Sequence, residues 1–418
     1  MEGQAHPAVS QPFAGVQSTV ISAYKEESVI MLLTRKRWSR GKRPLVTLAV
    51  AGPMLIGLAV AAPSTLAASY PLPVISASGL NLSMPDPGVY LYNGTFYEFS
   101  TGTGLQESHS SIAAGPWTTP ANELDTSSIP SWIDYSKGFW APDMIRTTSG
   151  EFVVYFSAAL AGIPSGNPAG SDADPAGGAR CIGTAESSSP TGPFSINPAP
   201  LVCFSQYGAA DNMTGDPASR VLGEGVVDAS PVFVTISGSQ ELFLVYKTQG
   251  DPGSGQTVTI RMVRLSDSDG TTVLGDSHQL LYSSTGSFSD TIEGPSLIQN
   301  GSYFILFVAA GNYDSCGYST EWFKSQHIWS WTNDGGTTLL DQSNTGGLCG
   351  PGGADVSASE VAGQDRIFFH GWVADNTGTI TTTPESPTAG SAARVMYAAV
   401  LTFGSDGYTP IIGAYQGQ

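Results

Sequence analysis

The chain has 418 residues, of which 50 are Gly, 28 are Pro and only 12% are charged, and its formal net charge is −18. This composition is typical of a turn-rich β protein and excludes a mainly helical or a disordered chain. An acidic surface repels phosphate groups and anionic lipids, so we expect neither nucleic acid nor a membrane surface as a partner. A neutral ligand meets no such repulsion.

The first 68 residues are interpreted as an N-terminal extension with a signal peptide. Residues 35–44 are strongly basic, and residues 45–69 are apolar and end in small residues, with cleavage expected after Ala67 or Ala68. The apolar run is also long enough for a signal anchor, but its content of Ala, Gly and Pro favours secretion. We therefore expect a secreted protein whose domain comprises residues 69–418.

The four cysteines, Cys181, Cys203, Cys316 and Cys349, suggest two disulfides in an exported chain. Three pairings are possible, and proximity favours Cys181–Cys203 and Cys316–Cys349. No Cys-x-x-Cys spacing indicates a zinc site. Four Asn-x-Ser/Thr sequons fit a glycosylated protein, although asparagines in turns would give the same pattern. These asparagines are Asn81, Asn93, Asn212 and Asn300.

Five stretches of the chain repeat one unit: an acidic residue, a short apolar strand, a turn glycine and an aromatic-rich strand. The units begin at Asp86, Asp143, Asp228, Glu293 and Asp355. Hairpins repeated at such intervals, with room for further strands, are typical of the blades of a β-propeller. We predict an all-β, five-bladed propeller in a single domain, with residues 394–403 as the strand that closes the ring.

The acidic residue that opens each unit is the basis for predicting a functional site. If all five lie near the start of the innermost strand of their blade, they face one end of the propeller axis. Converging carboxylates cost free energy unless they serve a purpose, so we predict a functional site there. For Asp143 and Asp355 an ordinary turn or strand-end role is an equal alternative.

The units resemble glycoside hydrolase family 43, the five-bladed enzymes that cleave α-L-arabinofuranosyl and β-D-xylosyl linkages. The resemblance covers about Asp86 to Trp372 and depends on several motifs in order. These are DPGVYLYNGTFYEFSTGTG, FWAPDMIRTTSGEFVVYFSAA, CIGTAESSSPTGPF, VVDASPVFV and IEGPSLIQNGSYFILF. The FSTGTGL stretch and a Gly-Pro-Gly loop favour arabinan-cleaving members over β-xylosidases.

The resemblance implies a role for each of four acids. Asp86 would be the general base that activates water, and Glu293 the general acid that protonates the departing sugar oxygen. Asp228 would orient Glu293 and favour its protonated form, and Asp143 would support the site. Such enzymes invert the anomeric centre, which requires the two carboxyl groups to lie about 6.5–9.5 Å apart.

The surroundings of Glu293 in the sequence suit an acid that has to stay protonated. It lies among Ile292, Pro295 and Leu297, and apolar walls together with the anion of Asp228 disfavour a second charge. The alternative is a glutamate at a strand end that faces solvent.

Two further residues are weaker candidates. His370 lies in FFHGW, where the resemblance implies a histidine near the axis beside a structural calcium ion; a buried core histidine is the alternative. Gly353 stands where the family loop usually carries a histidine, which does not favour the ion. Trp140 is the candidate for stacking on a sugar ring, although aromatic residues in strands more often serve packing.

The sequence therefore predicts a secreted, monomeric, inverting hydrolase that acts on arabinan or arabinoxylan of plant cell walls. No cofactor is required beyond the possible calcium. A β-xylosidase of the same family and a carbohydrate-binding propeller without catalysis remain as alternatives.

Overall fold

The computed structural model describes residues 70–77, 83–162, 180–203, 225–249, 256–284, 291–333, 335–357, 365–376 and 379–417. All of them belong to one compact unit, Leu66–Gln418. The predicted leader and two of the sequons, at Asn81 and Asn212, lie outside the described residues. Within those ranges, no helix is both long enough and apolar enough to cross a membrane.

The described residues of this unit form five antiparallel sheets, four with four strands and one with five. Blade 1 has strands β1 (Gly88–Tyr92), β2 (Thr95–Ser100), β3 (Gln106–Ser110) and β4 (Ala121–Asn122). Blade 2 has β5 (Phe139–Arg146), β6 (Phe152–Ala159), β7 (Arg180–Ser187) and β8 (Ser195–Ile196). Blade 3 has β9 (Val226–Ile236), β10 (Ser239–Gln249), β11 (Gln256–Leu265) and β12 (His278–Ser284).

The last two blades follow the same plan. Blade 4 has β13 (Ile292–Asn300), β14 (Tyr303–Ala310), β15 (Ser319–Ser325) and β16 (Thr337–Leu340). Blade 5 has β17 (Cys349–Ser357), β18 (Asp365–Asn376), β20 (Ala392–Phe403) and β21 (Pro410–Tyr415), and β19 (Thr379–Pro384) pairs with β18. The described connections contain three short 3-10 helices, η1 (Thr126–Ser128), η2 (Tyr135–Lys137) and η5 (Pro387–Ala389).

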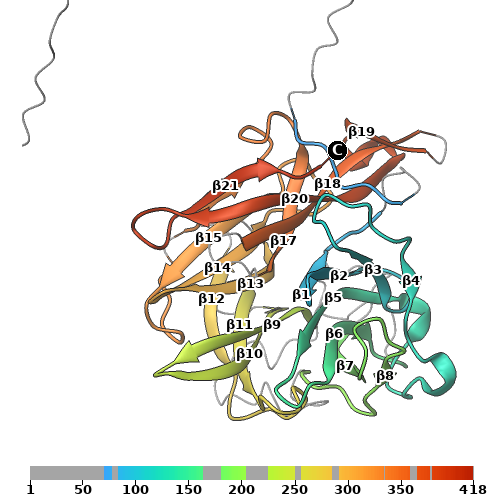
Figure 1. Ribbon diagram of the computed structural model, residues 1–418, viewed down its shortest axis with the longest axis vertical. Helices are drawn as coiled ribbons and strands as arrows, with labels where there is room; N and C mark the ends of the chain where they lie inside the picture. Colours follow the sequence, from blue (N-terminus) through green and yellow to red (C-terminus); the bar gives the residue numbers. More distant parts are fainter. Residues whose placement is uncertain are drawn as a thin grey trace, which may run out of the picture. The chain divides into compact units, whose positions relative to one another are not determined.

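The first strand of each blade is the innermost, and these five strands form a ring. Each contacts the inner strand of the next blade, and β17 contacts β1. Figure 1 shows β1, β5, β9, β13 and β17 side by side around the middle of the unit. The predicted all-β, five-bladed propeller is thus confirmed.

Tight hairpins between the first two strands explain why the sequence folds this way. Asn93-Gly94 and Ser237-Gly238 are two-residue loops in which both residues have positive φ. This conformation matches the twist of the flanking strands and is the one that Asn-Gly favours. The turn glycines of the repeated units therefore set the register of the hairpins.

Apolar side chains fill the space between neighbouring blades. Between blades 1 and 5, Phe96 packs edge-on against Phe368 with ring centroids 5.5 Å apart, and Trp117 packs against the same ring at 6.0 Å. Trp117 and Phe368 are fully buried. Burial of apolar surface contributes about 25 cal/mol per Å², so these contacts hold the ring closed.

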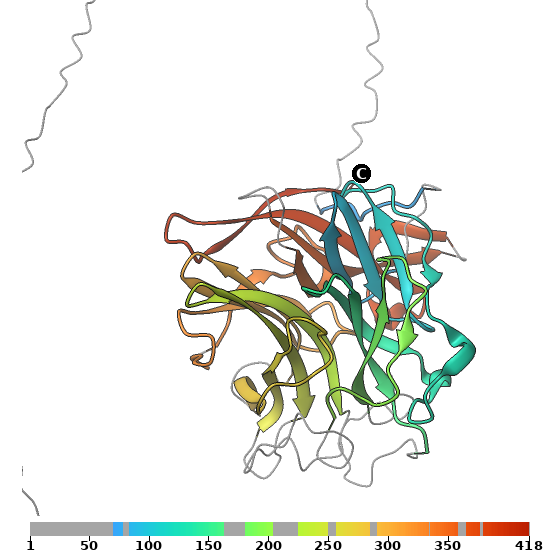
Figure 2. The same ribbon diagram turned by 60° about the horizontal axis from the view of Figure 1, so that its bottom comes forward.

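Hydrogen bonds close the ring as well. The backbone N–H groups of Val74 and Met84 donate to the carbonyls of Met396 and Arg394 in β20, at 3.0 and 3.1 Å. In Figure 2 the blue strands of blade 1 lie beside the red strands of blade 5. The predicted closing strand therefore does meet the start of the propeller.

Candidate active site

The inner strands of all five blades contribute to one cavity of about 220 Å³. Every acid that opens a repeated unit lines it, and so does Trp140. These acids are Asp86, Asp143, Asp228, Glu293 and Asp355. The chain thus brings together carboxyl groups that lie up to 269 residues apart in the sequence, which the proposed chemistry requires.

One backbone feature recurs where the inner strands reach the cavity. Within or just before each inner strand, one residue that lines the cavity has a φ between 39° and 58° and is followed by Pro or Ala. These residues are Asp86, Ala141, Asp228, Gly294 and Gly353. In β5, β9, β13 and β17 the pairing register shifts at this place. Such β-bulges bend a strand and redirect its side chains.

The five acids occupy three different positions relative to this positive-φ residue, so the expectation that they are equivalent is wrong. Asp86 and Asp228 are themselves the residues with positive φ, and Glu293 comes one residue earlier in its strand. Asp143 and Asp355 come two residues later, and their exposed fractions are only 8% and 9%. The last two therefore belong to a deeper level than the other three.

At the deeper level, hydrogen bonds link one blade to the next. Asp355 accepts bonds from the Ser296 hydroxyl at 2.9 Å and from the Val89 N–H at 2.8 Å. Asp143 is bonded to Ser230. Burial raises the pKa of Asp355 to about 6, and burial together with the charge of Asp355 raises the pKa of Asp143 well above its usual range. These two acids join blades as well as lining the cavity.

Asp86 is surrounded by groups that stabilise its ionised form. Arg394 Nη1 donates to Oδ1 at 2.7 Å, and the Thr101 hydroxyl donates to Oδ2 at 2.7 Å. Burial alone would raise the pKa of Asp86, but the guanidinium and these hydrogen bonds together lower it below its ordinary value. Asp86 is thus a carboxylate across the neutral range.

Glu293 and Asp228 form the opposite side of the site. Glu293 accepts bonds from Lys247 Nζ and from the Tyr318 hydroxyl, both at 2.9 Å. Asp228 Oδ2 accepts a bond from the Gly294 N–H at 3.0 Å. Burial raises the pKa of Asp228 to about 7, with Lys247 opposing the rise and the charge of Glu293 adding to it.

The surroundings of Glu293 differ from those expected from the sequence. Ile292 and Leu297 are buried in the apolar core between blades 3 and 4, and only Pro295 lines the cavity. The partners of the Glu293 carboxyl are therefore polar, whereas burial raises the pKa of the neighbouring Asp228 to about 7.

Trp140 lies at the cavity with its orientation fixed by an arginine. The guanidinium of Arg180 lies 3.4 Å from the centre of the Trp140 ring. Arg180 is fully buried and donates to the carbonyls of Lys137, Gly138 and Ser157. One face of the indole is thus covered, and the ring is held in place at the wall of the cavity.

Sequence reasoning missed several polar residues of the cavity. They are Thr101, Lys247, Tyr318 and Arg394. Lys247 had a detectable signal, because it is a lone lysine at the end of the apolar run LFLVY in the third unit. Arg394 begins the predicted closing strand, but only the closed ring brings it next to Asp86.

His370 is fully buried and contacts Asp86. Its Nδ1 accepts a hydrogen bond from the Asp86 N–H at 3.2 Å, so the neutral ring carries its proton on Nε2 and has no lone pair there for a cation. Burial lowers the pKa of His370 to about 3.

The described residues contain no group of three or more His, Cys, Asp or Glu side chains that could hold a metal, and Ca²⁺ takes six to eight oxygen ligands. This geometry does not favour the possible calcium, which stays a prediction.

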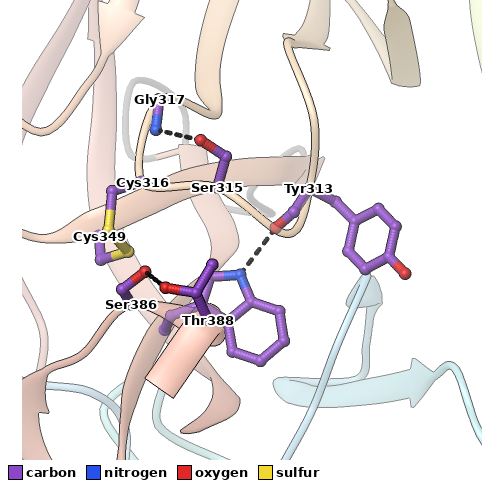
Figure 3. The surroundings of a disulfide bond; sticks show 8 residues. Tyr313, Ser315, Cys316, Gly317, Cys349, Ser386 and Thr388 are labelled. Carbon is purple, nitrogen blue, oxygen red and sulfur yellow. Dashed lines mark hydrogen bonds between the residues drawn. A yellow bond between two sulfur atoms is a disulfide. The ribbon is translucent and has the colours of Figure 1, made fainter. Parts of the chain in front are cut away.

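Both disulfides form with the predicted pairing, Cys181–Cys203 and Cys316–Cys349. Figure 3 shows the second one beside the loop that carries Tyr313, a residue that also lines the cavity. The Trp372 Nε1–H donates to the Tyr313 carbonyl at 2.7 Å. The disulfide and this bond tie the loop to blade 5.

A five-bladed propeller with carboxyl groups from several blades around one cavity is an architecture of glycoside-cleaving enzymes. The sequence profile of Glycosyl hydrolases family 43 matches residues 72–386. The chain therefore belongs to glycosyl hydrolase family 43, a family of O-glycosyl hydrolases.

Curated relatives agree with this family. Arabinan endo-1,5-alpha-L-arabinosidase A of Aspergillus aculeatus is 24% identical over 339 residues, which are 76% of this chain and 90% of that enzyme. Probable arabinan endo-1,5-alpha-L-arabinosidase C of Aspergillus flavus is 37% identical over 79 residues, 18% of this chain. That second match spans only about a quarter, 24%, of the relative's length.

Solved structures share the fold. A thermostable family-43 glycoside hydrolase superposes with a TM-score of 0.59 and 20% identity, covering 84% of this chain and 97% of that one. An alpha-L-arabinanase of Cellvibrio cellulosa in complex with arabinohexaose gives a TM-score of 0.54 and 16% identity, covering 80% of this chain and 96% of that one. At these identities the likeness concerns the fold alone.

Proposed function

We propose that this chain is a secreted, inverting glycoside hydrolase that cleaves α-L-arabinofuranosyl linkages of arabinan or arabinoxylan. The observation that carries the proposal is the cavity in which Asp86, Asp228 and Glu293 meet from three blades. Each of these carboxyl groups has different partners, and the pKa of Asp86 is lowered whereas that of Asp228 is raised. Such a difference between neighbouring carboxyl groups is what an acid–base pair needs.

Asp86 acts as the general base in this mechanism. Arg394 and Thr101 keep it ionised, so it can take a proton from a water molecule at neutral pH. That water attacks the anomeric carbon from the face opposite the leaving group. A single displacement of this kind inverts the configuration at that carbon.

Glu293 acts as the general acid. As the glycosidic C–O bond breaks, Glu293 gives its proton to the departing oxygen, and the product alcohol leaves. Asp228 lies beside it with a pKa raised to about 7 by burial, so the two carboxyl groups retain a proton at higher pH than an isolated acid does. Asp143, at the deeper level, supports the site through its bond to Ser230.

The arabinosyl specificity is supported by the relatives, which carry the name arabinan endo-1,5-alpha-L-arabinosidase. Trp140 offers an aromatic wall for the sugar, since sugar faces pack on rings that are held rigidly. Secretion is supported by the leader in the sequence and by the two disulfides, which persist in oxidising compartments.

The test measures hydrolysis of linear arabinan, an aryl arabinofuranoside and an aryl xyloside. We expect arabinose-containing products whose anomeric configuration, followed by NMR, is first opposite to that of the substrate. Glu293→Gln and Asp86→Asn should each lower kcat by about 10²–10⁴-fold while the melting temperature stays near that of the unmodified protein. Cleavage of the xyloside alone would overturn the arabinosyl assignment, and full activity in either variant would remove that residue from the mechanism.

A further inference from the structure

Lys247 is a buried cation that lines the candidate active site, and its place follows from the bulge in β9. It lies on β10 opposite Val227, where two residues of β9, Asp228 and Ala229, face only Tyr246. Only 3% of Lys247 is exposed. The bulge places Asp228 beside the lysine, and Nζ donates to Glu293 at 2.9 Å.

The two hydrogen bonds that Glu293 accepts do not suit a general acid that acts alone. Both partners of the Glu293 carboxyl, Lys247 and Tyr318, donate hydrogen bonds, and donors favour the ionised form of a carboxyl group. A general acid has to carry a proton. The two requirements agree if Glu293 and Asp228 form one pair that shares a proton. A nearby cation then determines how firmly the pair holds that proton.

Burial and Lys247 act on this pair in opposite directions. Burial raises the pKa of Asp228 to about 7, while the lysine lowers it. The charged or titratable groups whose fields reach the pair come from several elements. They are Lys247 of β10, Asp86 before β1, and Tyr318 before β15. Arg394 pairs with Asp86 instead, so among the residues that the structure describes Lys247 is the cation that contacts the pair.

We propose that Lys247 sets the acid strength of the Asp228–Glu293 pair and thereby the upper pH limit of glycosidic-bond cleavage. The inference depends on the proposed function, because it assigns Glu293 as the proton donor. Two desolvated carboxyl groups without a cation would hold their proton too firmly to pass it to a leaving oxygen. Transfer is most efficient when the acid's pKa lies near the working pH, and the ammonium keeps the pair there.

The test compares pH–rate profiles of Lys247→Met, Lys247→Arg and the unmodified enzyme. Activity falls at alkaline pH as the pair loses its proton. Without the ammonium the pair holds its proton more firmly, so in Lys247→Met we expect the alkaline limb of kcat/KM to move up by about one pH unit or more. The acid limb, which reports Asp86, should stay in place. Lys247→Arg keeps the charge and should keep both limbs.

The control is Lys324→Met, which removes an exposed lysine on β15 that does not line the cavity. It should leave the profile unchanged. If Lys247→Met fails to fold, Lys247→Gln serves as the second neutral variant. An alkaline limb that stays in place in a folded neutral variant overturns the proposal, and so does a shift of equal size in Lys247→Arg.

A second readout separates this proposal from the proposed function. In ¹³C NMR of carboxyl-labelled protein, a carboxyl of the pair should titrate near pH 7 in the unmodified chain and higher in Lys247→Met. This titration needs no turnover. A protein that cleaves no glycoside but shows the shift disproves the proposed function and supports the role of Lys247. A titration that does not move disproves the role of Lys247 alone.

Discussion

Replacement of Arg394 by glutamine should move the acid limb of the pH–rate profile upward. Arg394 Nη1 lies 2.7 Å from Asp86 Oδ1, and the two side chains are only 15% and 25% exposed. Arginine beside an aspartate typically lowers its pKa by about 1–3 units. Because Thr101 still donates to Asp86 in the variant, we expect a rise of about 1–2 units, or about 1.4–2.7 kcal/mol.

The sign follows from the role that we propose for Asp86. The general base works only when ionised, so activity is lost as the pH falls through its pKa. A higher pKa in Arg394→Gln shifts this loss to higher pH and leaves the alkaline limb unchanged. The assay is kcat/KM for an aryl arabinofuranoside between pH 3 and 9.

The matched control for this experiment is Arg264→Gln. Arg264 also pairs with carboxylates, Glu241 and Asp267, at 3.0 and 2.7 Å, but it does not line the cavity. Its loss should leave both limbs in place. If the acid limb of Arg394→Gln coincides with that of the unmodified enzyme, Asp86 is not the base that this limb reports.

Two further predictions concern Trp140 and Glu98. Trp140→Ala should raise KM for arabino-oligosaccharides about tenfold with a smaller effect on kcat, because it removes stacking area; steady-state kinetics with an unchanged KM would contradict a role in binding. Glu98 is fully buried in blade 1, and burial raises its pKa well above the ordinary value. Since the folded state holds this proton more firmly than the unfolded state, stability declines as the pH rises above the unfolded pKa. Glu98→Gln should therefore gain about 1–3 kcal/mol over the parent at pH 8 and less at pH 4, and equal urea midpoints at both pH values would refute this.

Much of the fold was predictable because its signals are local. The Asn-Gly and Ser-Gly turns and the aromatic strands after them mark hairpins without any knowledge of distant contacts. Their fivefold repetition then gave the number of blades. The convergence of Asp86, Asp228 and Glu293 followed from the same repetition, although their catalytic roles stay predictions.

The remaining features depend on contacts that no local pattern encodes. Each bulge shifts the pairing register by one residue. Glu293 lies before the bulge of its strand and Asp355 lies after the bulge of its own, so the two acids occupy different levels although both open a repeated unit. Arg394 reaches Asp86 only because the ring closes between residues 308 positions apart. Lys247 of blade 3 contacts Glu293 of the neighbouring blade 4. A pattern within one strand cannot predict which cation meets which carboxyl.

The recurrent positive-φ residue also makes this scaffold attractive for protein engineering. Four of its five occurrences are Asp or Gly, and in blade 2 it is Ala141. Asp and Asn tolerate that backbone conformation best among residues with a side chain, so Ala141 can be exchanged for either with little strain. At Gly353, by contrast, an added Cβ would lie 2.7 Å from His370 Cε1. Ala141 lines the cavity, so a designer can install a new polar group at the cavity wall there without rebuilding the propeller.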